Sequence, residues 1–339
     1  MEREAQMGSY YDIIGDVHGC ASLLEERLID LGYRRREGTG AYRHQDHDNY
    51  RAIFVGDLID RGPQQLETLE LVKAMVDTGS AQIVMGNHEF NAIAYATENP
   101  ENGEFLRPHN KKNTRQHRAF LDQLTASQRQ YYVDWFKTMP LWLDLDEIRV
   151  IHACWHEESM SIVQKACAGD RFTDSHQLVL ATDGNSDLYE AVERLLKGPE
   201  IDLAAYELPK FKDKGGDIRG KARNRWWSKS TKLSEIAELS GCTDEHDKPY
   251  RDLTGIEAKP VDQEFSYTDP IPVFYGHYWR ENEPVEHDDF TDYTACVDFS
   301  AVKSGKGLGT LVAYRWSADR PKITRKNYCP PSAGHRSAT

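Results

Sequence analysis

The sequence predicts an α/β fold built on a parallel sheet. Three times in the first hundred residues, a short apolar run is followed by a polar loop and then by a segment with helical spacing. This alternation is typical of βαβ units, in which helices connect parallel strands. Of the 339 residues, 39% are hydrophobic, which is enough to bury a full core. The three apolar runs are 10–14, 51–55 and 81–85.

A helix is expected after each of these strands. Leucines recur on one face of 23–31, Pro63 precedes a second amphipathic segment at 64–76, and a third segment covers 90–96. Between strand and helix lie glycine-bounded loops with acids and histidines. Loops at the C-terminal ends of parallel strands are where α/β proteins usually bind ligands.

The strand–loop–helix rhythm stops near residue 98. Residues 98–140 are expected to form a helical excursion that shapes the rim of a site, with helices near 117–124 and 127–137. Residues 141–151 resemble a β-hairpin whose second strand ends at His152.

Residues 155–268 are the least regular part of the chain. Apolar periodicity at 188–196 and 232–239 predicts a mostly helical insertion. Strand character returns at 272–275, 294–299 and 310–316. We therefore expect one domain over 8–320, followed by a disordered tail at 328–339.

Composition narrows the function classes. The six cysteines are scattered without a C-x-x-C pair, which argues against a disulfide framework or a zinc–thiolate site and favours a reducing cytoplasm. The sequence has no secretory h-region and no apolar run of membrane-spanning length. A net charge of −13 disfavours broad contact with nucleic acid. We expect neither a membrane nor a stable nucleic-acid partner.

Oxygen and imidazole donors follow five predicted strands. Singly, each has a simple structural explanation as a turn residue or a satisfied histidine. Together they favour borderline divalent ions, and their number suits two ions better than one. Two ions that share a carboxylate can clamp a phosphoryl group. The candidates are Asp16, His18, Asp57, Asn87, His88, His152 and His277.

Three blocks carry a resemblance to a known family. Gly15-Asp16-Val17-His18-Gly19, Gly56-Asp57-Leu58-Ile59-Asp60-Arg61-Gly62 and Gly86-Asn87-His88-Glu89 resemble the signature blocks of the calcineurin-like metallophosphoesterases. Within that family the chain is most similar to the phosphoprotein-phosphatase branch, which includes bacterial serine/threonine phosphatases and dinucleoside tetraphosphatases. Many members read Gly-His-x-His in the last block, whereas this chain reads Gly276-His277-Tyr278-Trp279, as that branch does.

The resemblance implies a four-layer α/β/β/α sandwich with helical insertions and two divalent ions. Mn²⁺ is the first expectation, with iron, zinc, cobalt or nickel as alternatives. It further implies in-line attack by a metal-bridging hydroxide, with Asp57 joining the two ions. The implied ligands are Asp16 and His18 for one ion and Asn87, His152 and His277 for the other.

The same resemblance implies catalytic roles for three neighbours of the metals. His88 would be the general acid, Asp60 would orient it, and Arg61 would grip phosphate oxygens with its planar fork. Asp298 would support the metal ligands from behind. A second basic residue usually completes the phosphate clamp, and the candidates that the sequence leaves open are Arg223, Arg225 and Lys229.

Three functions remain open at the level of the sequence. The first is a phosphomonoesterase that acts on a phosphorylated protein or a small phosphorylated metabolite. The second is a dinucleoside tetraphosphate hydrolase, since the basic and aromatic residues interleaved at 219–227 could bind a nucleotide, although they could equally form a solvated rim. The third is a non-catalytic scaffold that uses the fold for binding.

Overall fold

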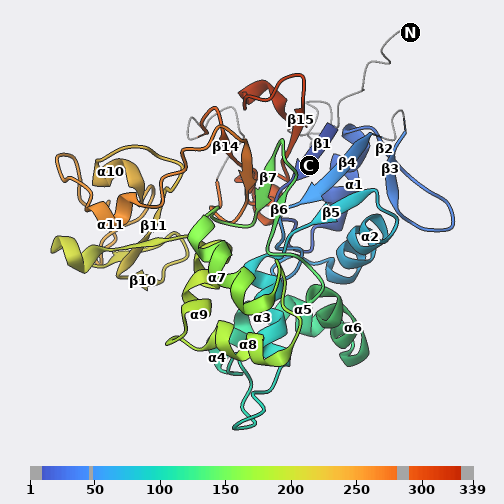
Figure 1. The fold of residues 1–339 in the computed structure, drawn as a ribbon, viewed down its shortest axis with the longest axis horizontal. Helices are drawn as coiled ribbons and strands as arrows, with labels where there is room; N and C mark the ends of the chain where they lie inside the picture. Colours follow the sequence, from blue (N-terminus) through green and yellow to red (C-terminus); the bar gives the residue numbers. More distant parts are fainter. Residues whose placement is uncertain (1–9, 46–48, 281–289, 330–339) are drawn as a thin grey trace.

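The computed structural model describes residues 10–45, 49–280 and 290–329, and two β-sheets form its centre (Figure 1). In the first sheet β1, β4 and β5 run parallel, while β15 is antiparallel to both of its neighbours. The three predicted strand–loop–helix units are therefore confirmed. The strand order is β16 (Tyr328–Cys329), β15 (Ala313–Ser317), β1 (Tyr10–Ile14), β4 (Tyr50–Phe54) and β5 (Ala81–Ile83).

The second sheet contains the predicted hairpin. Its β6 and β7 are antiparallel, whereas β7, β13 and β14 run parallel. Their order is β14 (Thr294–Cys296), β13 (Val273–Tyr275), β7 (Arg149–Ile151) and β6 (Trp142–Asp144).

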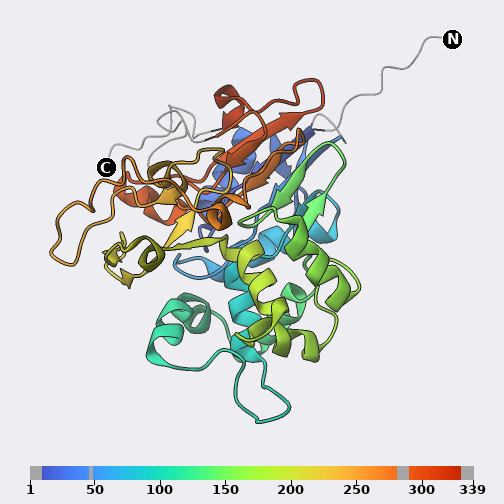
Figure 2. The same ribbon diagram turned by 60° about the vertical axis from the view of Figure 1, so that its left-hand side comes forward.

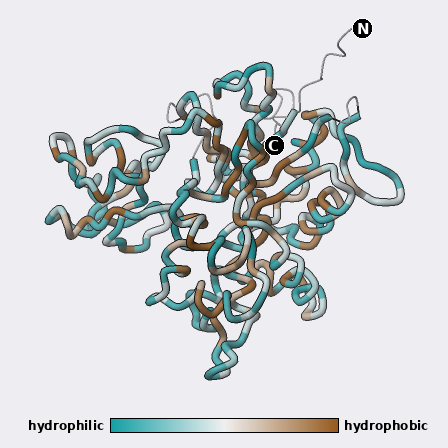
Figure 3. Tube along the Cα trace, viewed as in Figure 1, coloured by the Kyte–Doolittle hydropathy of each residue, from teal (hydrophilic) through white to brown (hydrophobic). Residues whose placement is uncertain are grey.

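The two sheets pack face to face. Alternate side chains of the strands, such as Ile13, Ile53, Val150 and Phe274, form one buried cluster between them. Their neighbours in the chain, such as Ile14 and Tyr275, point outward into a second buried cluster that also contains residues of the helices. Because side chains alternate along a strand, one apolar run can serve both the inter-sheet core and the helical layer. Figure 3 shows hydrophobic residues concentrated in these central strands.

Helices cover both outer faces and complete four layers. The first sheet is covered by α1 (Ala21–Asp30) and α2 (Gln65–Asp77), whose inward leucines join Ile14 in the core. On the second sheet, Tyr275 packs against Trp226 with ring centroids 4.8 Å apart. The helices of this side are α7 (Glu157–Cys167), α8 (Ser175–Thr182) and α9 (Asp187–Lys197). The predicted α/β/β/α sandwich is confirmed.

The predicted excursion follows α3 (Asn87–Ala96) and contains three helices. In Figure 2 its first part, coloured teal, forms the lower end of the molecule. Helix α6 begins with a capping box in which Thr125 accepts a hydrogen bond from the Gln128 backbone. The three helices are α4 (Lys111–Gln116), α5 (Arg118–Gln123) and α6 (Ala126–Phe136).

The prediction of a mostly helical insertion over 155–268 is wrong in its second half. The last helix longer than four residues ends at Lys197 in this segment, and residues 199–268, here called the small unit, are mainly short strands and loops around their own apolar cluster. The helix predicted at 232–239 shrinks to α10 (Leu233–Ile236), after which the chain pairs as a strand. The unit's other named elements are β8 (Glu200–Asp202), η1 (Leu203–Tyr206), β9 (Phe211–Lys212), β10 (Ile218–Arg219), β11 (Lys221–Asn224), β12 (Ala237–Glu238) and α11 (Pro260–Gln263).

The prediction of a disordered tail starting at 328 is wrong at its first two residues, because Tyr328–Cys329 pair with β15. The rest of that tail, 330–339, lies outside the described residues. In the part of the chain that the structure describes, we find no helix long and apolar enough to cross a membrane. Outside the two central sheets, β2 (Tyr33–Arg35) and β3 (Tyr42–His44) form an antiparallel pair of their own. The short helices of this part are η3 (Ala301–Lys306) and η4 (Arg325–Asn327).

Candidate active site

The carboxyl ends of β1, β4, β5, β7 and β13 meet at one edge of the two sheets, and the predicted ligands lie in the loops that leave them. The backbone there is strained. Non-glycine residues adopt positive φ at His18 (46°), Asp57 (52°), Asp60 (68°), Arg61 (68°) and His277 (64°). Each such conformation costs about 1–3 kcal/mol and persists only where the surroundings impose it, which is common at functional sites.

Glycines allow these loops to touch. A Cβ on Gly276 would lie 2.0 Å from Asp16 Oδ1, and one on Gly56 would lie 2.4 Å from the Gly86 nitrogen. Gly56 also has a φ of +95°, which favours glycine. The glycines of the signature blocks therefore bring polar side chains from both sheets into contact.

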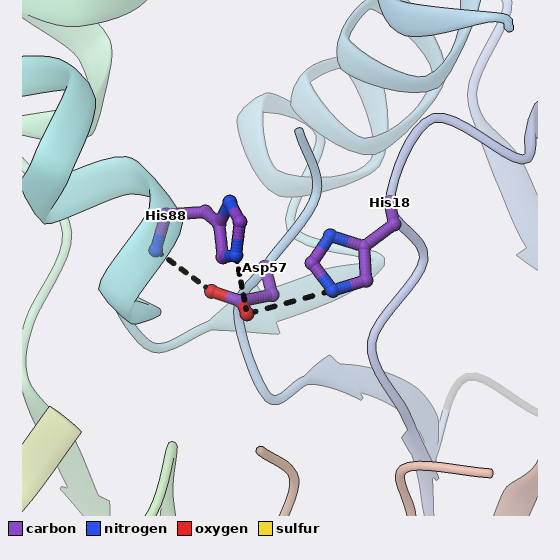
Figure 4. Close-up of side chains that lie close together, drawn as sticks. All are labelled: His18, Asp57 and His88. Carbon is purple, nitrogen blue, oxygen red and sulfur yellow. Dashed lines mark hydrogen bonds and ion pairs between the residues drawn. The ribbon is translucent and has the colours of Figure 1, made fainter. Parts of the chain in front are cut away.

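Asp57 lies between histidines from both sheets. Its Oδ2 is 3.6 Å from His18 Nε2, and its Oδ1 is 3.4 Å from His152 Nε2. Figure 4 shows His18 and His88 on either side of the carboxylate. Because each oxygen faces a different imidazole, this carboxylate can bridge two cations.

Backbone carbonyls fix the orientation of the two histidines. His18 Nδ1 donates to the Ile59 carbonyl at 2.7 Å, and His152 Nδ1 donates to the Val55 carbonyl at 2.8 Å. This pairing places the proton on Nδ1 and leaves the Nε2 lone pair directed at Asp57, the form in which histidine binds metals.

Asn87, His277 and Asp16 complete the cluster. Asn87 Oδ1 is 3.1 Å from His152 Nε2 and 2.8 Å from His277 Nδ1. Asp16 Oδ2 accepts a hydrogen bond from the His277 backbone nitrogen at 3.2 Å, whereas its buried Oδ1 has no hydrogen-bond partner. All six predicted metal ligands therefore converge.

The chemistry of this cluster fits divalent cations. Burial, together with the Asp298 and Asp57 carboxylates, raises the pKa of Asp16 well above its usual value. Burial lowers the pKa of His18 and His277 well below the usual histidine value, which favours the neutral imidazole, the form that can bind a metal. Closely spaced buried carboxylates cost free energy unless a cation compensates them. A cation would also stabilise Asp16 Oδ1, which is buried without a hydrogen-bond partner.

Among the described residues, two groups of titratable side chains have metal-ligand spacing, and they share Asp57. One is Asp57 with His152 and His277, and the other is Asp57 with His18 and His88. His88 differs from the other histidines because its second nitrogen is held by a carboxylate: His88 Nδ1 is 2.5 Å from Asp60 Oδ2.

Asp60 also binds a second histidine that the sequence analysis missed. Its Oδ1 is 2.9 Å from Nδ1 of the buried His117, which lies in the excursion and stacks on Phe120. Although burial opposes it, hydrogen bonds from His117 and His88 lower the pKa of Asp60 to about 2. An ionised Asp60 accepts from both rings and fixes the orientation of His88. No local pattern marks His117, because its partner lies 57 residues away.

Glu89 is the second residue that the sequence analysis missed. Its buried carboxylate accepts hydrogen bonds from the backbone nitrogens of Asp57 and Leu58 at 2.8 Å and of Gly86 at 3.0 Å. Burial and the charge of Asp57 raise the pKa of Glu89 to about 7. Glu89 lies three residues after Gly86, the residue that precedes helix α3. This spacing could have identified it as a helix-capping residue.

Two of the predicted phosphate-binding arginines lie at the cluster. Arg61 Nη2 is 3.5 Å from His88 Nε2, and its guanidinium lies 5.9 Å from the centre of the Trp279 ring. Arg223 donates to the His277 carbonyl at 3.0 Å. Burial lowers the pKa of Arg223, and the positive charge of Arg61 contributes to the shift.

The structure does not bring the other basic candidates to the cluster. Arg225 forms an ion pair with Glu238 at 3.0 Å, and Lys229 lines a separate pocket together with Arg225. Trp226 and Trp227 are almost fully buried, and Trp227 lines the same separate pocket as Lys229. Of the basic and aromatic residues interleaved at 219–227, Arg223 alone borders the metal-ligand cluster.

Asp298 lies behind the metal ligands. Its Oδ2 accepts from the Trp279 backbone at 2.9 Å and its Oδ1 from the Ser300 backbone at 3.0 Å. Its charge acts on Asp16, but the described hydrogen bonds of its carboxylate hold the turn after His277 and do not hold an imidazole.

Comparison with known proteins identifies the same family as the three sequence blocks. A sequence model of the calcineurin-like phosphoesterase family matches 11–229, more than half of the chain. The chain is 34% identical over 143 residues to an asymmetrical bis(5'-nucleosyl)-tetraphosphatase of Oceanobacillus iheyensis, a match that covers 42% of this chain and 54% of the relative. It is 26% identical over 176 residues to a symmetrical bis(5'-nucleosyl)-tetraphosphatase of Marinomonas sp., covering 50% and 54%.

The chain thus spans about half the length of the curated relatives it matches. Among solved structures it is similar to a cold-active protein-tyrosine phosphatase of a psychrophile Shewanella sp., with a TM-score of 0.44 and 16% identity over 91% of this chain and 80% of that one.

Proposed function

The chain belongs to the calcineurin-like phosphoesterase family, and on that premise we propose that it is a metal-dependent hydrolase that removes a terminal phosphoryl group from its substrate. The observation that carries the proposal is the shared Asp57, which faces a histidine of each sheet while His88 stands beside it, held by Asp60. The residues that would hold the two ions are Asp16, His18, Asp57, Asn87, His152 and His277.

When bound, two divalent ions, with Mn²⁺ as our first expectation, would neutralise the phosphoryl oxygens and increase the acidity of the attacking water. Arg61 and Arg223 would hold the remaining phosphoryl oxygens. Arg61 can use both arms of its planar fork. The bond from Arg223 to the His277 carbonyl fixes its guanidinium next to the same site.

His88 would supply the proton that the leaving group needs. The attacking water would release one proton to solvent and its oxygen would form a bond to phosphorus. The bond from phosphorus to the leaving oxygen would break, and the proton on His88 Nε2 would pass to that oxygen. Asp60 keeps the other ring nitrogen protonated and stabilises the positive ring before transfer. The strain at Asp57, Asp60 and Arg61 supports preorganisation of this loop.

Hydrolysis of dinucleoside tetraphosphates is the second candidate. The names of the two curated relatives favour it. Trp226 and Trp227 are almost fully buried, and the pocket that Trp227 lines contains none of the predicted metal ligands, so neither ring supports the nucleobase stacking that the sequence had suggested. A polyphosphate chain would therefore have to be recognised by charge.

A substrate panel tests the proposal. The protein with Mn²⁺ is assayed on p-nitrophenyl phosphate, a dinucleoside tetraphosphate, and phosphoserine and phosphotyrosine peptides. We expect release of phosphate or nucleotide that stops when a chelator is added and returns with the metal. Full activity in excess chelator would contradict the proposal. Metal binding without turnover of any substrate would favour the non-catalytic scaffold.

A further inference from the structure

A pocket of about 490 Å³ opens next to His88, on the side of the excursion. Its lining includes Arg61 and His88 together with Arg107, Arg115 and Gln116. The pocket therefore adjoins the phosphoryl site that we propose, at the residue that would face the leaving group.

The charge of this pocket is opposite to that of the whole chain. The net charge of the chain is −13, yet four arginines line the pocket. Among the described residues that line it, Asp60 is the one acid, and both of its oxygens are occupied by His88 and His117. A concave surface with this charge selects anions.

Arg107 is built into the wall. Its Nη1 donates to Asn91 Oδ1 and its Nη2 to Gln116 Oε1, both at 2.9 Å. Its backbone nitrogen donates to the Ala94 carbonyl at 2.9 Å. Asn91 and Ala94 belong to α3, the helix that carries His88, so the guanidinium and the proposed acid are held on one rigid element.

The side-chain partners of Arg107 are neutral amides, unlike those of two other arginines withdrawn from solvent. Arg315 pairs with Asp12, and Arg280 pairs with Glu238. The charges of Glu193 and Asp60 act on Arg107, but no described carboxylate forms an ion pair with it. A half-buried guanidinium without an opposite charge is costly, and an anion would offset that cost.

We propose that this pocket binds a second phosphate group, carried by the leaving group of the substrate, and that Arg107 is its principal contact. The inference rests on the proposed function for the position of the leaving group beside His88. It adds a requirement that the metal site does not impose, namely a second anionic group beyond the phosphoryl group that is removed.

A binding experiment tests the pocket without turnover. The probes are 1,3-propanediol monophosphate and 1,3-propanediol bisphosphate, which differ in the second phosphate alone, and they are titrated by calorimetry into metal-free protein in chelator. We expect the bisphosphate to bind about tenfold more tightly, as one charge-assisted contact would give. Arg107→Gln should remove that preference, and Arg36→Gln, at an exposed arginine on the loop after β2, should keep it.

Gln116→Glu provides a second route if Arg107→Gln does not fold. It gives Arg107 a carboxylate partner of the same shape, so the preference should again disappear. No preference in the wild type, or a preference that survives both substitutions, would overturn the proposal. Because these measurements need no metal and no catalysis, an inactive enzyme would contradict the proposed function and leave this test intact.

Turnover then identifies the source of the second phosphate. The Mn²⁺-loaded enzyme is assayed on a dinucleoside tetraphosphate and on a peptide with two adjacent phosphoserines. The substrate whose kcat/KM falls about tenfold in Arg107→Gln, and not in Arg36→Gln, is the class that uses the pocket. Equal rates for wild type and Arg107→Gln on both substrates would overturn the assignment.

Discussion

The strand-end site and the small unit (residues 199–268) are both rich in charged and aromatic residues, but they place them differently. At the strand ends, Asp57 and His152 are almost fully buried and contact residues far away in the sequence. In the small unit, Lys212 pairs with Asp247 and Lys232 with Glu257 at the surface.

The difference lies in what surrounds the charges. Exposed ion pairs contribute about 0–1 kcal/mol, since water already solvates both partners. Buried carboxylates that converge, as they do at the strand ends, need a compensating positive charge. Composition alone suggested function for both regions, whereas burial and convergence distinguish them.

Asp57→Asn should break the strand-end site most severely. An amide cannot bridge two cations as a carboxylate does, so we expect loss of bound metal and a fall in kcat of about a thousandfold or more. Metal content after dialysis and steady-state rates measure the two effects.

Asp60→Asn is the matched control in the same loop. Asp60 contacts His88 and His117, and neither of its oxygens faces the metal-ligand cluster. We expect this variant to retain its metal and to lose rate. Identical behaviour of the two variants would refute the separate roles of the two acids.

His88→Asn should have the next largest effect. Loss of a general acid costs about a hundredfold or more with a poor leaving group, and less with p-nitrophenolate, which leaves without a proton. Rates on an alkyl phosphate and on p-nitrophenyl phosphate give the comparison. An equal loss on both substrates, or loss of metal, would place His88 among the metal ligands, as its distance from His18 and Asp57 also permits.

The strand-end site was largely predictable because its signals are local. Each ligand directly follows an apolar strand, and parallel strands bring their carboxyl ends to one edge. His117 was not predictable, because its contact with Asp60 depends on how the excursion folds back over the loop.

The small unit was wrongly predicted to be mostly helical for a related reason. Its strands are two to four residues long, too short for alternation to show, and its apolar cluster is assembled from many separate turns. From the sequence alone, Trp226 and Trp227 fit an exposed surface as well as a buried core. Their packing on Tyr275 is a tertiary fact, since Tyr275 lies in another part of the chain.

His117→Phe should have a smaller effect than either catalytic substitution. Phenylalanine can keep the stacking on Phe120 but leaves Asp60 Oδ1 without its donor. We expect kcat to fall about tenfold, the cost of one hydrogen bond to a charged group, with KM unchanged. His117→Gln, which can still donate, should recover part of the loss. Equal rates for the Phe and Gln variants at equal stability would show that the hydrogen bond does not matter.

Glu238→Gln should have the smallest effect on turnover. It tests how much a charged pair in the small unit contributes to the free energy of unfolding. Glu238 is the exception in this unit because it is mostly withdrawn from solvent, and it pairs with Arg225 at 3.0 Å and Arg280 at 2.7 Å. Burial opposes ionisation, but the two arginines lower the pKa of Glu238 from 4.5 to about 2. A carboxylate with a depressed pKa stabilises the fold above its unfolded pKa, and this contribution is lost as pH falls from about 4.5 to 2.

At neutral pH, Glu238→Gln should therefore lower the free energy of unfolding by about 3 kcal/mol, because it leaves the buried Arg280 and the partly buried Arg225 without their carboxylate. The difference from wild type should shrink steadily below about pH 4.5. Urea unfolding at several pH values measures it. The exposed Lys232→Ala serves as the control, with a change within about 0.5 kcal/mol at every pH. A pH-independent difference for Glu238→Gln would mean that packing, and not charge, holds the small unit against the second sheet.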